Sequence, residues 1–291
     1  MRTFWIRTLS AIVYVILFLG TMFSGVLTGH LQAGMLLFAA FLLFVTVGCS
    51  FEFLRMVGLQ GARPSKPLAY LFSIVGFLLL GIPSIMGLNV ALFGYMIVFY
   101  CLFAISVIVQ LWQRSEQPFR EVAYTLIPLL YIAVPLALML TVLQDHGPLV
   151  LLLVVAMVWV NDSGAYIGGS LFGRHKMWPR HSPGKTWEGT SFGVFVAVVF
   201  AVLTGPAVST ITWPHWLVLA LVCSIVGTLG DLVESMLKRS VGVKDSGSIM
   251  PGHGGFLDRF DSLLIIMPFV YFYLTITDPD NTFFLIVQLF S

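Results

Sequence analysis

The chain has 291 residues, of which 58% are hydrophobic and only 10% charged, and its mean hydropathy is +0.97. Soluble domains usually carry about 25% charged residues, so the composition excludes an ordinary soluble protein and indicates a polytopic membrane protein. The net charge is only +2, and the sequence contains no basic stripe of the kind that binds nucleic acid, so nucleic acid is excluded as a partner.

Nine apolar segments are long enough to cross a bilayer core about 30 Å thick, which takes about 20 residues per helix. They cover residues 8–28, 31–51, 67–87, 90–112, 122–143, 148–171, 189–208, 214–237 and 259–277. The segments lack the alternation of barrel strands, so we predict an all-α membrane protein with about nine transmembrane helices.

The basic residues indicate the orientation. All 15 Lys and Arg residues fall on the same side of the membrane if nine helices are present. Because Lys and Arg are retained in the cytoplasm, the sequence predicts a cytoplasmic amino terminus and places Asp278 and Asp280 on the far side. Chain length and the lack of a transit segment or extra domain favour a bacterial inner membrane.

Polar chemistry is concentrated in the second half of the chain. Residues 159–261 hold 7 of the 13 acidic and 8 of the 15 basic residues. Apart from Glu52, which ends the second helix, none of the first five predicted helices has an ionisable residue in its interior. We therefore expect a scaffold or lipid-chain wall followed by a catalytic region. The expected boundaries are 1–150 for the five N-terminal helices and 151–291 for the catalytic region, with cytoplasmic loops 173–188 and 238–258.

The first polar cluster, "WVNDSGAYIGGSLFG", places Asn161 and Asp162 well inside the sixth segment. A carboxylate inside a bilayer costs at least about 2.5 kcal/mol and is by default a functional-site hypothesis. The alternative is a polar residue hydrogen-bonded to a neighbouring helix. Glycines at small-xxx-small spacing allow close helix approach, so we predict a packing role for Gly164, Gly168, Gly169 and Gly173.

The second cluster, "RHKMWPRHSPGKTWEG", is a predicted cytoplasmic loop with four cations. An anionic ligand, anionic headgroups or the plain orientation signal would each explain Arg174, Lys176 and Arg180. Ser182 and Lys185 bracket a predicted "SPGK" turn before a helix, where backbone N–H groups and a lysine can hold phosphate. The GxxxxGK[ST] spacing of a Walker loop is absent.

The third cluster begins at the end of the eighth segment, "GDLVESMLKRSVGVKD". At 100° per residue, Asp231, Glu234, Ser235 and Lys238 project within an arc of about 100° on one helix face. Two carboxylates, a hydroxyl and an ammonium group are thus expected together at the cytoplasmic boundary.

A glycine-punctuated loop follows, and "FLDRFD" then opens the ninth helix with Asp258 and Asp261 at i, i+3 spacing. The loop glycines permit positive φ and close backbone approach to a ligand; they are Gly242, Gly247, Gly252, Gly254 and Gly255. Carboxylates gathered with Lys and Arg around such a loop suit nucleotidyl or phosphoryl transfer, which needs oxygen ligands for Mg²⁺ and cations for phosphate. A network of ion pairs closing a helix junction is the alternative, but it gives no reason for the glycines.

The segment "SMLKRSVGVKDSGSIMPGHGGFLDRFD", residues 235–261, resembles the signature of the phosphatidate cytidylyltransferase family, also called CDP-diacylglycerol synthases. Met250 stands where the family usually has Leu, Ile or Phe, a change without chemical consequence. The strings "NDSGAY" and "SPGKTWEG" also resemble family motifs, so the resemblance covers residues 159–261. The N-terminal 150 residues match only in being several apolar helices.

The resemblance implies a magnesium-dependent reaction in which CTP and phosphatidate give CDP-diacylglycerol and pyrophosphate. It also implies a location in membrane lipid and, often, a homodimer. The metal ligands expected are Asp231, Asp258 and Asp261, with Asp245 and, in a second tier, Asp162. The residues expected to contact substrate or phosphate are Lys238, Lys244, Arg259, Arg239, Ser235, Ser182, Lys185 and Asn161. His253 either binds phosphate when protonated or makes a loop hydrogen bond.

Three rival functions stay open at this point. An ion-coupled transporter would also place carboxylates in the membrane, but such proteins commonly show repeated halves, and here polarity is confined to one half. A CTP-dependent lipid-alcohol kinase and a cytidylyltransferase for another lipid phosphate are nearer rivals. An enzyme that transfers a phosphoalcohol from CDP-lipids is excluded, because its D-G-x-x-A-R type motif does not occur in the sequence.

Overall fold

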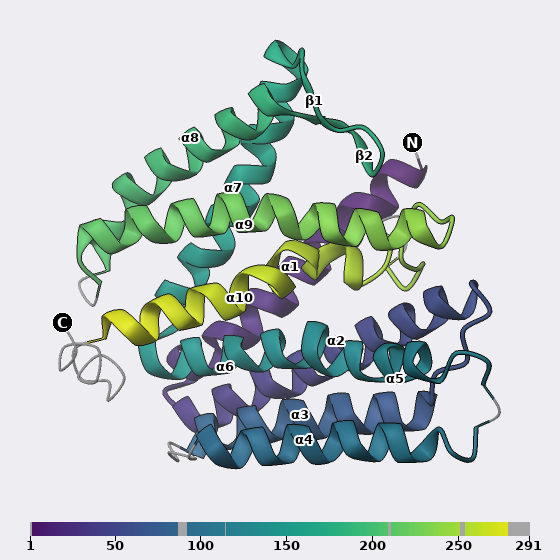
Figure 1. Ribbon diagram of the computed structural model, residues 1–291. Coiled ribbons are helices and arrows are strands. Elements are labelled where there is room, and N and C mark those ends of the chain that lie inside the picture. The colour runs from purple at the N-terminus through teal and green to yellow at the C-terminus, as the bar shows by residue number, and fades with distance from the viewer. Residues whose placement is uncertain (1, 87–91, 114, 209–210, 251–253, 279–291) are drawn as a thin grey trace, which may run out of the picture. The chain divides into compact units, whose positions relative to one another are not determined.

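A computed structural model describes residues 2–86, 92–113, 115–208, 211–250 and 254–278 (Figure 1). Its helices are α1 (Arg2–Thr28), α2 (Leu31–Gly58), α3 (Lys66–Met86), α4 (Leu92–Val109), α5 (Pro118–Ile127), the π-helix η1 (Pro128–Ala133), α6 (Val134–His146), α7 (Pro148–Phe172), α8 (Trp187–Thr204), the short 3₁₀-helix η2 (Gly205–Ala207), α9 (Trp213–Ser240) and α10 (Leu257–Thr277). One short hairpin, β1 (Lys176–Trp178) and β2 (Ser182–Thr186), joins α7 to α8. The predicted all-α class is confirmed.

In the part of the chain that the structure describes, each predicted apolar segment coincides with a helix over most of its length. Within the described residues, eight helical spans are long and apolar enough to cross a membrane, and Gly94–Val109 is a shorter apolar helix. The fifth segment is a continuous span, Pro118–His146, with a π-helical turn at its centre. Pro128 is the first residue of this turn, and Pro135 lies just after it. Because proline lacks an N–H and clashes with the carbonyl four residues earlier, the helix widens there.

The outer helix faces are apolar. Leu9 and Ile16 of α1, Phe44 of α2 and Phe195 of α8 each expose more than 60% of their surface. Such surfaces are unfavourable in water but match lipid chains, and the helices satisfy their own backbone hydrogen bonds, as a bilayer core requires. The protein is an integral membrane protein.

The chain packs as two compact units, which share the helices α9 and α10. Unit 1 comprises Met1–Gln144 and Leu237–Phe260, and unit 2 comprises Asp145–Met236 and Asp261–Ser291. The first unit thus contains the N-terminal helices together with the loop that follows α9. The second contains α7, the hairpin, α8, most of α9 and most of α10.

In unit 1, α1 packs along α2, and α3 packs against α2, α4 and η1 (Figure 1). Phe18 of α1 makes an edge-to-face contact with Phe38 of α2, with ring centroids 5.8 Å apart. Phe72, Leu102 and Leu129 form a buried cluster between α3, α4 and η1. Helix α2 contacts α1, α3 and η1, and 13 of its 28 residues are buried.

In unit 2, α7 and α8 lie side by side along most of their length (Figure 1). A Cβ added at Gly164 would meet the Cα of Gly193 at 3.1 Å, and one added at Gly168 would lie within 3 Å of the Phe192 ring. The predicted packing role of these glycines is therefore confirmed, because side chains there would separate the helices.

The predicted turn at "SPGK" is wrong, because residues 182–185 belong to strand β2. The turn lies immediately before β2, at residues 179–181. Strand β1 pairs antiparallel with β2, with Lys176 opposite Thr186 and Trp178 opposite Ser182. Pro183 is tolerated because both strands of a two-stranded hairpin are edge strands. Thr186 then caps α8, its hydroxyl accepting a hydrogen bond from the Gly189 N–H at 3.2 Å.

Candidate active site

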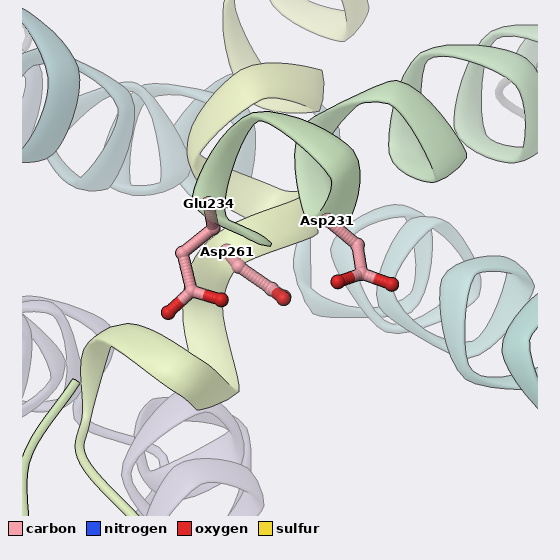
Figure 2. Close-up of side chains that lie close together, drawn as sticks. All are labelled: Asp231, Glu234 and Asp261. Carbon is pink, nitrogen blue, oxygen red and sulfur yellow. The ribbon is translucent and has the colours of Figure 1, made fainter. Parts of the chain in front are cut away.

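Three carboxylates converge in unit 2. Asp231 and Glu234 project from α9, Asp261 projects from α10, and one oxygen of each lies within 4.8 Å of the others (Figure 2). Glu234 is fully buried, whereas Asp231 and Asp261 are partly exposed. Like charges at this separation strongly disfavour joint ionisation, and a cation bound among them would relieve the repulsion.

Small residues on α9 bring α10 close enough to form this group. A Cβ added at Gly230 would meet the Cα of Ser262 at 3.0 Å and the Asp261 carbonyl oxygen at 3.2 Å. One turn earlier, a Cβ at Gly227 would meet the end of the Ile266 side chain. Gly230 therefore lets the backbone of α10 pass directly beside the turn of α9 that carries Asp231 and Glu234.

Lys185 brings a positive charge to this group of carboxylates. Its ammonium group lies 2.6 Å from Asp231 Oδ2 and donates a hydrogen bond to the Thr228 carbonyl oxygen at 3.2 Å. The side chains of Lys185 and Asp231 are 22% and 32% exposed, so solvent or a ligand can still reach the pair. The hairpin thus delivers a cation from the connection between α7 and α8 to the acidic face of α9.

A cavity of about 490 Å³ adjoins the ion pair. Its walls come from α7, β2, α8 and α9, and its polar lining includes Asp162, Tyr166, Ser170, Ser182, Lys185, Thr186, Thr190, Thr228 and Asp231. The lining combines apolar surface with hydroxyls, carboxylates and an ammonium group, and these polar groups can fix a phosphorylated ligand. The structure therefore brings together Ser182, Lys185, Asp162 and Asp231, as expected for a common site.

Asn161 lies at the back of this region and is completely buried. Its amide nitrogen is 3.4 Å from Asp162 Oδ1 and 3.5 Å from Thr228 Oγ1. Its Oδ1 atom makes no hydrogen bond to any of the described residues. Asn161 thus connects α7 to α9 and orients the Asp162 carboxylate, so a direct substrate contact is not needed to explain it.

The donor set fits a hard divalent cation. The group of three consists of carboxylate oxygens, which Mg²⁺ prefers, whereas a zinc site would be expected to include nitrogen or sulfur. Ser235, one turn beyond Asp231 on α9, donates a hydrogen bond to Asp231 Oδ1 at 3.3 Å and helps to orient it. Asp231, Glu234 and Asp261 could therefore hold such an ion.

Asp258 makes a different set of contacts, within unit 1. Its carboxylate pairs with Lys238 at 2.7 Å and accepts hydrogen bonds from the backbone N–H groups of Ser246, at 3.0 Å, and Gly255, at 2.8 Å. The Ser246 hydroxyl lies 2.9 Å from the same carboxylate. Asp258 thus ties the loop after α9 to the first turn of α10.

The remaining sequence-predicted residues lie on the loop or at its edges. Lys244, Asp245, Arg239 and Arg259 are exposed, and Arg239 donates a hydrogen bond to the Val243 carbonyl oxygen at 3.0 Å. Asp245 and Arg55 line a small polar hollow of about 150 Å³ in unit 1. His253 lies outside the described residues.

The loop glycines divide into two kinds. Gly242 and Gly254 have φ values of 75° and 83°, so the predicted positive φ is confirmed for them. Gly247 and Gly255 do not have positive φ; they allow a close approach instead, because a side chain at either position would collide with the carboxylate of Glu52. Gly252 falls in the part of the chain that is not described.

Sequence reasoning missed two acidic residues that the structure makes prominent. Glu234 lay on the predicted acidic face but was given no metal role, although its i, i+3 relation to Asp231 was a sufficient signal. Glu52 lies at the end of the second predicted helix, and no local pattern predicts its contacts, because they join residues about 200 positions apart.

Comparison with known proteins agrees with this geometry. Residues 5–277 match the cytidylyltransferase family. The chain belongs to this family.

Curated relatives cover most of the chain. A phosphatidate cytidylyltransferase of Bacillus subtilis (strain 168) is 37% identical over 241 residues, which is 78% of this chain and 84% of the relative. Proteins of the same name from Staphylococcus haemolyticus (strain JCSC1435) and Staphylococcus aureus (strain COL) are 32% and 33% identical over 270 residues, covering 90% of this chain and 96% of theirs. The likeness to cytidylyltransferases therefore extends through the N-terminal helices, where no motif was recognisable.

Proposed function

We propose that this protein transfers the cytidylyl group of CTP to phosphatidate, giving CDP-diacylglycerol and pyrophosphate for phospholipid biosynthesis. Membership of the cytidylyltransferase family and the similarity to phosphatidate cytidylyltransferases support the reaction class and the substrates. The observation that carries the proposal is the group of three carboxylates beside a cavity that contains Lys185, because nucleotidyl transfer needs both oxygen ligands and a phosphate-binding cation.

The chemistry requires no enzyme nucleophile. A phosphate oxygen of phosphatidate forms a bond to the α-phosphorus of CTP, and the bond from that phosphorus to the bridging oxygen of the β-phosphate breaks. The electron pair leaves with pyrophosphate. The protein therefore has to hold two anions in line and neutralise charge on the α-phosphoryl group and the leaving group.

The residues of unit 2 divide this work. Asp231, Glu234 and Asp261 would hold Mg²⁺, which supplies charge neutralisation between the phosphates when bound. Lys185 exchanges its partner Asp231 for a phosphate oxygen of CTP, and Ser182 and Thr190 donate hydrogen bonds from the cavity wall. Asn161 orients Asp162, which stays at the edge of the metal site.

Residues at the end of α9, in the loop that follows it and at the start of α10 complete the proposal. Lys238, Lys244, Arg239, Arg259 and His253 contact phosphate groups of the substrates, and Ser235 donates to a phosphate oxygen. Asp258 and Asp245 are proposed as further metal ligands. In the structure Lys238 pairs with Asp258 Oδ1, while Oδ2 accepts hydrogen bonds from the N–H groups of Ser246 and Gly255. On substrate binding Lys238 moves to a phosphate oxygen, which frees Asp258 Oδ1 for the metal while Oδ2 stays held by the loop.

The proposed location is the bacterial inner membrane, with the active site facing the cytoplasm, where CTP is made. The basic connections on one side of the apolar segments support this orientation. A homodimer is part of the proposal through the family resemblance alone.

The test is transfer of label from [α-³²P]CTP into chloroform-extractable lipid by purified protein in detergent with phosphatidate and Mg²⁺. We expect labelled lipid that requires phosphatidate and metal, and that disappears with EDTA or in Asp231→Asn. No label from a folded protein would refute cytidylyl transfer. Label from [γ-³²P]CTP with a lipid alcohol would instead establish a lipid kinase.

A further inference from the structure

Glu52 is a fully buried carboxylate on α2, in the half of the chain that carries no other site residue. Within unit 1 it accepts three hydrogen bonds from the segment that follows α9. The Ser246 hydroxyl lies 3.1 Å from Glu52 Oε2, the Leu257 N–H lies 2.9 Å from the same oxygen, and the Phe256 N–H lies 3.2 Å from Oε1. A buried carboxylate is tolerated only with such partners.

These contacts make Glu52 the N-terminal cap of α10, supplied by another helix. The first N–H groups of a helix have no partner within it, and the positive end of its dipole attracts an anion. Capping usually comes from the side chain just before the helix, but Phe256 stands there and cannot accept a hydrogen bond. Glu52 satisfies the Phe256 and Leu257 N–H groups instead.

The rest of the α2 face is shaped for the same segment. Phe44 packs edge-to-face on Phe256 with ring centroids 5.5 Å apart, and a Cβ at Gly48 would lie 2.8 Å from that ring. Phe44, Gly48 and Glu52 are spaced four residues apart and therefore share one face of α2. From the other side, Gly247 and Gly255 leave the room that the carboxylate occupies.

The same hydrogen bonds lead to Asp258. Ser246 Oγ lies 3.1 Å from Glu52 Oε2 and 2.9 Å from Asp258 Oδ2, so its single proton can be donated to either carboxylate and the hydroxyl links the positions of the two. Gly255 both packs on Glu52 and donates its N–H to Asp258. Glu52 thus fixes the start of α10 and the two residues that orient the Asp258 carboxylate.

We propose that Glu52 is a positioning residue for catalysis: it anchors the glycine-rich loop and the first turn of α10 so that Asp258 and Lys238 are held for the substrates. The proposal rests on the proposed cytidylyl transfer. It assigns a catalytic purpose to a helix that otherwise serves only as scaffold. Glu52 touches no reacting atom and acts through Ser246, Gly255 and the α10 N-terminus.

The chain offers a matched control in Glu121. This residue is also a buried carboxylate of unit 1, 1% exposed, and it accepts a hydrogen bond from the Arg63 N–H at 2.8 Å and pairs with Arg120 at 3.3 Å. It holds the connection between α2 and α3 rather than the loop after α9. Glu52→Gln and Glu121→Gln therefore each replace a buried carboxyl group of the same unit by an amide.

The experiment combines two measurements on the full-length protein in detergent. The first, amide hydrogen exchange without substrate, reports whether the backbone amides of the held segment stay protected; these are Ser246, Gly255, Phe256 and Leu257. The second, initial rates, gives kcat and the Mg²⁺ concentration for half-maximal rate. In Glu52→Gln we expect faster exchange at these amides, kcat lowered about tenfold or more, and a higher Mg²⁺ requirement. In Glu121→Gln we expect a lowered Tm with kcat and Mg²⁺ requirement unchanged.

Other outcomes overturn the proposal. Unchanged exchange would show that Glu52 does not hold the segment, and faster exchange with unchanged kcat would reduce it to a structural contact. If Glu52→Gln does not accumulate, Glu52→Asp keeps the charge but withdraws the carboxylate, and the same comparison applies. A wild-type protein that makes no labelled lipid would refute the proposed function, whereas the exchange data would still decide what Glu52 holds.

Discussion

Asp231 takes part in two interactions of opposite kind. Its carboxylate pairs with Lys185, and it also belongs to the group of three carboxylates with Glu234 and Asp261. The partly exposed ion pair is worth at most about 1 kcal/mol, whereas the like charges beside it are unfavourable until a cation is bound. The residue is therefore arranged for binding rather than for stability.

Asp231→Asn should separate these two effects. We expect activity to fall about 100-fold or more, because the metal ligand is lost, while the Tm without divalent ions stays within a few degrees of wild type. In the wild type, saturating Mg²⁺ at about 100 times its Kd should add about 2.7 kcal/mol to the free energy of unfolding. Thermal unfolding with and without Mg²⁺ measures this difference, and an equal Mg²⁺ effect in both proteins would remove Asp231 from the site.

Lys185 makes a distinct prediction. In Lys185→Met the stem is kept and the charge is lost, so we expect the KM for CTP to rise about tenfold or more while the KM for phosphatidate changes little. Lys176→Met is the matched control, since Lys176 is an exposed cation on the same hairpin. Initial rates over a range of CTP concentrations decide the matter; equal KM values in the two variants would contradict a role for Lys185 in phosphate binding.

At the residue scale, local patterns predicted part of the site. Asp231, Glu234 and Ser235 were placed on one face by helical spacing, and Lys185 by its position before a helix. The partner of Lys185 could not be predicted, because a hairpin rather than a turn carries it to α9. The role of Glu52 could not be predicted either, because it depends on contacts with residues about 200 positions away, which hydropathy and spacing do not encode.

At the element scale, the apolar segments were sufficient to locate the helices. A run of about 20 apolar residues has one stable form in lipid, so length and composition determine the element directly. The hairpin was missed because three to five residues with a proline carry little strand signal. The π-helical turn of η1 was also not predicted, although Pro128 and Pro135 marked its position.

The crossing of α9 and α10 carries the element-scale prediction. Gly230→Ala places a methyl group against the backbone of α10, which must move by a few tenths of an ångström and take Asp261 with it. We expect kcat to fall about tenfold, because small displacements of catalytic groups are costly. Gly227→Ala, one turn away, meets only the end of the Ile266 side chain, which can rotate, so its kcat should stay within about twofold of wild type.

Both glycine variants should be assayed beside a measurement of Tm. A lowered kcat with a nearly unchanged Tm in Gly230→Ala would indicate displacement of Asp261 rather than unfolding. If the two alanine variants have the same kcat, the close approach at Gly230 does not position the carboxylate.

At the scale of the whole molecule, the sequence predicted a membrane protein and its orientation from two independent features. Apolar faces of the helices, such as those of α1, require lipid, and the Lys and Arg residues fall in alternate connections. The sequence predicted two regions that meet near residue 150, but not that Leu237–Phe260 would belong to the unit of the N-terminal helices, because this follows from tertiary contacts. The loop with the family signature is therefore held by the half of the chain that has no recognisable motif.

The orientation leads to a prediction for the intact cell. Because Lys and Arg favour retention of a connection in the cytoplasm, a cysteine at Glu116 or Arg180 should be cytoplasmic, and one at His30 should face outward. The parent would be a variant without Cys49, Cys101 and Cys223 that retains activity. We expect a membrane-impermeant maleimide to label His30→Cys in intact cells, and Glu116→Cys and Arg180→Cys only after the membrane is opened. The reverse pattern would place the Lys185 hairpin away from cytoplasmic CTP and contradict the proposed reaction. Equal labelling of Glu116→Cys and His30→Cys would contradict the predicted three membrane spans between these two positions.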